Sequence, residues 1–136
     1  MKRQLIGLML LLGISNAVFA HEVPQKARVW IDFPKNGVVV NNPVQVKFAT
    51  QGYQVAPAGE NVHKAGHYHL LLDLKQDFDR DEPIPRDQYH IHYDQGETQA
   101  ALNLSPGKHT LQLVLGDEEH EPFEELMSEK ITITVR

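Results

Sequence analysis

The chain has 136 residues, a formal net charge of −5 and no cysteine. Without cysteine the protein cannot form disulfides, thiolate-ligated zinc sites or iron–sulfur clusters. The negative charge argues against nucleic acid and anionic membranes as partners and favours cations. The length suits one domain with one modest core.

The first twenty residues predict a cleaved signal peptide. Lys2 and Arg3 precede an apolar run over residues 5–14, and small residues lead to a cleavage point after Ala20. The run is shorter than the ~20 residues that a transmembrane helix needs, and no second apolar stretch follows. We therefore expect an exported, periplasmic protein without a transmembrane segment.

The predicted mature chain begins at His21 and loses the two basic residues of the signal, which takes its net charge from −5 to −7. Residues 21–27 are expected to form an N-terminal arm and residues 28–136 a single domain. The sequence gives no indication of the oligomeric state.

Apolar residues in the mature chain alternate with period two, which predicts strands rather than helices. Seven runs show this pattern between turns rich in Pro, Gly and Asn, and they indicate an all-β, immunoglobulin-like antiparallel sandwich. The runs are 28–33, 44–48, 67–74, 89–94, 98–104, 109–115 and 131–135. The predicted core residues are Tyr68, Leu70, Leu72, Ile91, Leu111, Leu113 and Ile133.

Long connections, which are often functional, are predicted over 51–66 and 75–87, with an acidic stretch at 117–125. Aspartates alternate at 77–81 as in an EF-hand loop, but Glu82 replaces the required glycine and Gln88 the bidentate glutamate, so a solvated acidic loop is expected. Phosphate-loop, G-x-S-x-G and H-E-x-x-H motifs are absent. The sequence therefore assigns no catalytic residue and favours a protein that is not an enzyme.

Two His-x-His pairs are the most specific chemical signal in the sequence. His67 and His69 lie in one predicted strand, and His90 and His92 lie in the next. Because alternate strand residues point the same way, each pair presents two imidazoles on the face opposite the apolar one. Such an arrangement suits Zn²⁺ or Cu²⁺.

An antiparallel pairing of these two strands would place His69 opposite His92, His67 opposite Asp94 and His90 opposite Leu71. The strand ending at Leu115 would bring His120 to the same rim. The candidate metal ligands are His67, His69, His90, His92 and His120, with His21, Asp73, Asp94 and Asp117 as further candidates. A structural hydrogen-bond network among the histidines is the alternative.

His21, if it begins the mature chain, offers an α-amine and an imidazole that can chelate copper together with another histidine. The segment from Pro34 to Phe48 also resembles part of the periplasmic copper-resistance carriers.

Several motifs in order resemble the DUF4399 family of exported bacterial proteins over about residues 28–135. The resemblance rests on APAG at 56–59, GHYHLLLD at 66–73, DEPIP at 81–85, HIHY at 90–93, PGKHTL at 106–111 and LGDEEHEP at 115–122. The family has no established function, so the resemblance implies a fold and an exported location but no activity. It includes both His-x-His pairs, Asp117 and His120.

Three classes of function remain open from the sequence. The first is binding or handling of a divalent transition metal, copper or zinc. The second is a non-enzymatic module for adhesion or for interaction with another envelope protein, in which the histidines only stabilise a polar face. The third is a metal-dependent enzyme, which needs an open coordination position and a substrate cleft.

Overall fold

The computed structural model describes residues 26–136, so the predicted signal peptide and His21 lie outside the described residues. This part of the chain forms ten strands and no helix, and therefore no helix that could cross a membrane. The strands are β1 (Arg28–Phe33), β2 (Val39–Val40), β3 (Val44–Gln51), β4 (Gln54–Val55), β5 (Ala65–Leu72), β6 (His90–His92), β7 (Gln99–Leu102), β8 (Gly107–Gly116), β9 (Pro122–Met127) and β10 (Ile131–Val135).

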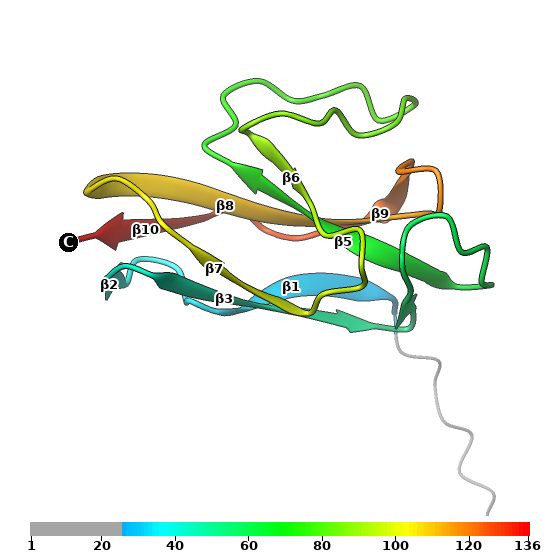
Figure 1. Ribbon diagram of the computed structural model, residues 1–136, viewed down its shortest axis with the longest axis horizontal. Coiled ribbons are helices and arrows are strands. Elements are labelled where there is room, and N and C mark those ends of the chain that lie inside the picture. The colour runs from blue at the N-terminus through cyan, green and yellow to red at the C-terminus, as the bar shows by residue number, and fades with distance from the viewer. Residues whose placement is uncertain (1–25) are drawn as a thin grey trace, which may run out of the picture.

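The strands make two sheets that face each other, which confirms the predicted all-β sandwich (Figure 1). One sheet has the order β1-β3-β7. The other has the order β2-β10-β8-β5-β4, with β6 also paired to β5 and β9 also paired to β8. Pairing is antiparallel except between β2 and β10 and between β4 and β5.

The strand count differs from the seven that were predicted because β2, β4 and β9 were not anticipated. β9 lies partly inside the acidic stretch that was expected to be a loop. Its Leu126 is fully buried, while Glu124 and Glu125 remain exposed. One buried leucine thus ties this charged segment to the core as a strand beside β8.

The main hydrophobic core lies between the two sheets. Of the predicted core residues, Tyr68, Leu70, Leu111, Leu113 and Ile133 are buried. Leu72 and Ile91 are only half-buried, because Leu72 ends β5 and Ile91 belongs to the short outer strand β6.

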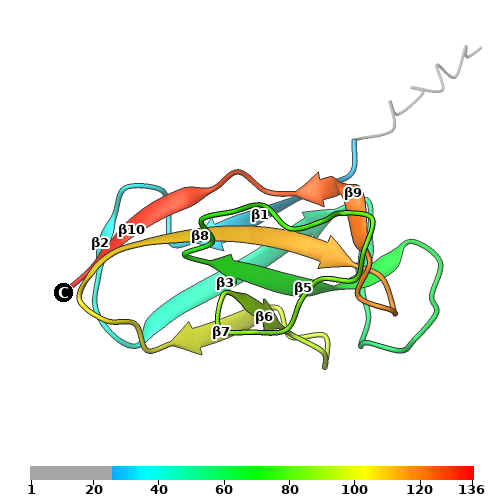
Figure 2. The same ribbon diagram turned by 90° about the horizontal axis from the view of Figure 1, so that it is seen from above.

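Strand β5 is buried on both of its faces. Its inner face carries Tyr68 and Leu70 into the main core, whereas Leu71 packs outward in a second apolar cluster with Ile84 and Val114. The loop that follows β5 crosses over β8 before it returns to β6 (Figure 2). The outer face of this sheet is therefore covered beside the position of the first His-x-His pair.

Candidate metal centre

Four imidazoles from three parts of the chain meet on the outer face of β5. His67 and His69 come from β5 itself, on the opposite face from Tyr68 and Leu70. β6 places His92 directly opposite His69, as the predicted register required. His120 comes from the turn between β8 and β9, which lies at the same end because β5 and β8 are antiparallel.

The ring nitrogens of these four histidines, which we call the histidine cluster, point toward one another. One nitrogen from each ring lies within 4.8 Å of the other three. His120 Nδ1 is 2.9 Å from His67 Nε2, 3.4 Å from His69 Nε2 and 3.2 Å from His92 Nδ1. Four ligands at zinc–nitrogen bond lengths around a tetrahedral ion would be about 3.3 Å apart. The three measured separations lie close to that spacing.

Hydrogen bonding alone does not account for these contacts. His92 Nε2 donates to the Pro85 carbonyl at 2.7 Å, so the neutral ring has only a lone pair on Nδ1. If His120 Nδ1 carries no hydrogen, its lone pair faces the lone pair of His92 Nδ1. If it carries a hydrogen, that hydrogen can bond to only one of the three neighbouring ring nitrogens. A cation at the centre would accept one lone pair from each of the four rings at once.

Burial keeps the inner histidines neutral, which is the form that binds metals. His67 and His69 are fully buried. Desolvation, reinforced by the neighbouring imidazoles, lowers the pKa of His67 to about 4 and that of His69 to about 2. Desolvation also lowers the pKa of His92. The rings therefore offer lone pairs well below the pH at which a free histidine is protonated.

A glycine on β8 makes the room for the His69 ring. Gly116 pairs with His67 across the sheet, and a Cβ added at Gly116 would lie 2.7 Å from His69 Cε1. Ordinary contacts between carbon atoms are about 3.5–4.0 Å. The site thus requires a residue without a side chain at position 116.

Two of the candidate carboxylates adjoin the histidine cluster. Asp94 Oδ1 lies 3.7 Å from His67 Nε2 and from His92 Nδ1. Asp117 instead organises the turn that carries His120, because its Oδ1 accepts the backbone N–H groups of Glu119 and Glu121, each at 2.9 Å. His120 itself has a positive φ of 67°, a conformation that this turn must hold.

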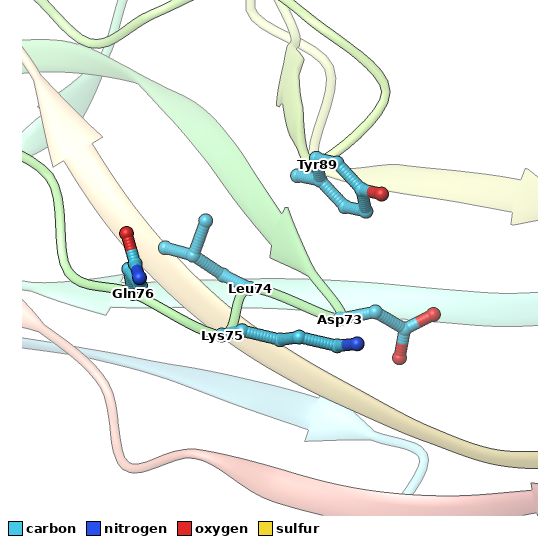
Figure 3. Close-up of a pocket in the computed structure, with 5 residues that line it drawn as sticks. All are labelled: Asp73, Leu74, Lys75, Gln76 and Tyr89. Carbon is cyan, nitrogen blue, oxygen red and sulfur yellow. The ribbon is translucent and has the colours of Figure 1, made fainter.

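The structure does not bring His90 or Asp73 to the histidine cluster. His90 lies opposite Leu71, as the register predicted, and its Nδ1 contacts Asp87 Oδ1 at 2.7 Å. Asp73 contacts His109 Nδ1 at 2.7 Å and lines a surface pocket of about 340 Å³ (Figure 3). The other residues of this pocket are Leu74, Lys75, Gln76 and Tyr89, so it shares none with the histidine cluster.

Sequence reasoning missed the residues that support the site from outside. Gly116 shapes the space for His69, and Ile84, Pro85 and Arg86 contact the residues around the ring nitrogens. The available signals were a glycine directly before the acidic turn and the rigid P-I-P sequence in an otherwise polar loop.

Comparison with known proteins gives a family but no activity. A family model described as "Domain of unknown function (DUF4399)" matches residues 46–136. No curated protein and no solved structure matches this chain. The matched range includes all four members of the histidine cluster. The chain belongs to the DUF4399 family.

Proposed function

We propose that this protein binds a divalent transition metal, copper or zinc, in the periplasm. The observation that carries the proposal is the convergence of ring nitrogens from His67, His69, His92 and His120 within 4.8 Å of one another. Imidazole is a ligand suited to both metals. The predicted signal peptide supports the location, and the negative charge of the mature chain supports a cation as the ligand.

A purely structural histidine network accounts less well for the same atoms. Within residues 26–136, Asp94 Oδ1 is buried without a hydrogen-bond partner, 3.7 Å from His67 Nε2 and from His92 Nδ1. Buried polar groups are normally satisfied, and a network that leaves some of them unpaired is destabilising. A bound cation would offset this cost by attracting the nearby carboxylate and coordinating the imidazoles.

Binding is favoured over catalysis by how closed the cluster is. The side chains of His67 and His69 are inaccessible to solvent, and that of His92 is 2 % exposed. Only His120 and Asp94, at 28 % and 31 %, face the solvent. A catalytic metal needs an open position beside a substrate cleft, whereas a closed set of four nitrogens is typical of a site that holds an ion.

Calorimetric titration of tag-free protein with Zn²⁺ and Cu²⁺ at pH 7.5 tests the proposal. We expect one ion per chain in a His21→Ala background, which removes the N-terminal chelate. The His69→Ala/His92→Ala double variant should lose this uptake, whereas a variant of the exposed His63 should retain it. No uptake by the His21→Ala protein, or equal uptake by the double variant, would contradict the proposal.

A further inference from the structure

One three-residue segment of the loop between β5 and β6 contacts three different parts of the site. We call residues 84–86 the clasp. Ile84 donates its backbone N–H to His120 O at 2.8 Å, and the Pro85 carbonyl accepts from His92 Nε2 at 2.7 Å. Arg86 donates to Asp94 Oδ2 at 2.7 Å. Ile84 anchors the clasp, because it is buried in the second apolar cluster.

These contacts fix how the donor atoms face the centre. The bond to Pro85 leaves the lone pair of His92 on Nδ1, the nitrogen that lies 3.2 Å from His120 Nδ1. The bond from Arg86 occupies Asp94 Oδ2, and Oδ1 stays buried on the side of the histidines. Asp94 Oδ1 is 3.7 Å from His67 Nε2 and from His92 Nδ1 and 3.9 Å from His120 Nδ1.

Charge and spacing both suit a fifth donor. Arg86 Nη2 lies 2.7 Å from Asp94 Oδ2, so its positive charge is paired with the carboxylate oxygen that does not face the histidines. Asp94 Oδ1 lies 3.7 to 3.9 Å from ring nitrogens of His67, His92 and His120. These distances fall between the tetrahedral edge of about 3.3 Å and the roughly 4.2 Å between opposite ligands in a five- or six-coordinate site.

We propose that Asp94 is the fifth ligand of the site and that the clasp, through Arg86, presents its Oδ1 to the metal. This inference rests on the proposed function and specifies its ligand: a divalent ion that accepts four imidazoles and one carboxylate. Tetragonal nitrogen and oxygen sets are typical of Cu²⁺. Arg86 is a positioning residue that acts through Asp94.

Titration with Cu²⁺ in the His21→Ala background, together with electron paramagnetic resonance of the bound ion, tests the inference. Asp94→Asn should weaken Cu²⁺ binding at least tenfold and change the copper hyperfine splitting. Arg86→Gln keeps the carboxylate but releases it, and should weaken binding by about 10- to 100-fold, the range for residues that orient metal ligands. Arg80→Gln is the matched control, because Arg80 pairs with Asp77 on the same loop but lies outside the site.

Two outcomes overturn the inference, and they are distinguishable. If the His21→Ala protein takes up no Cu²⁺, both the proposed function and the fifth ligand fail. If it binds Cu²⁺ but Asp94→Asn and Arg86→Gln match Arg80→Gln in affinity and spectrum, the histidine site stands and Asp94 is not a ligand. Circular dichroism of each metal-free variant establishes that it is folded. If Asp94→Asn does not fold, Arg86→Gln with the affinity and spectrum of Arg80→Gln overturns the inference.

Discussion

Replacing Gly116 by alanine is expected to displace His69 from the histidine cluster. The new Cβ would lie 2.7 Å from His69 Cε1, 3.1 Å from its Nδ1 and 3.3 Å from the Glu121 carbonyl oxygen. Because carbon atoms normally stay about 3.5–4.0 Å apart, the imidazole must move by about 1 Å. The backbone at position 116 cannot retreat easily, since it pairs with both β5 and β9.

Both stability and metal affinity should fall in the Gly116→Ala variant. Overpacking of a closed site typically costs about 1–3 kcal/mol of unfolding free energy. Coordination tolerates errors of only about 0.2 Å in bond length, so a ring displaced by about 1 Å should weaken metal binding at least tenfold. Urea unfolding of the metal-free protein measures the first effect, and competition with a chelator measures the second.

Gly37→Ala is the control for general destabilisation. Gly37 has a φ of 82°, but a Cβ there would meet nothing within 4 Å. Alanine at this position should therefore cost about 1–2 kcal/mol through backbone strain while leaving metal affinity unchanged. If Gly116→Ala binds metal as tightly as the wild type, the position of the His69 ring is irrelevant and the proposed coordination is wrong.

Three further predictions concern stability. The metal-free protein should lose stability as pH falls from 6.5 to about 4, because only the unfolded chain protonates His67, His69 and His92 there. In urea titrations, His67→Gln should remove up to roughly 3 kcal/mol of this loss, and an unchanged pH dependence would contradict the burial of His67 as a neutral ring. Burial lowers the pKa of His109, but the hydrogen bond to Asp73 outweighs burial, and the pKa of His109 is raised. Asp73→Asn should therefore cost about 1 kcal/mol of unfolding free energy below pH 6.5 and less above the raised pKa. A cost that does not change with pH would refute the ion pair. Leu70→Ala should cost about 2–5 kcal/mol in the same assay, and a loss below 1 kcal/mol would contradict its place in the core.

Strand periodicity was sufficient to predict the centre of the site. The alternation at residues 67–70 separates His67 and His69 from the core, and one assumed hairpin register places His69 opposite His92. His120 followed from topology, because an antiparallel β8 returns to the end of β5 where His67 lies.

Periodicity does not show which candidate ligands lie away from the histidine cluster or which residues support it, because both depend on contacts between distant parts of the chain. His90 and His92 share a strand face, but His90 lies opposite Leu71, beside apolar residues and away from His120. Asp73 leaves the strand with a φ of 53° and turns to His109. The course of the loop over β8 depends on where Ile84 finds apolar partners, and local sequence does not specify that.

Anomalous diffraction from crystals of the metal-loaded, tag-free protein locates the bound ion. We expect one strong peak per chain on the outer face of β5. It should lie within about 2.0–2.2 Å of ring nitrogens from His67, His69, His92 and His120. A peak at any other position, such as the N-terminus or the acidic loop at 75–87, with these four imidazoles left uncoordinated, would contradict it.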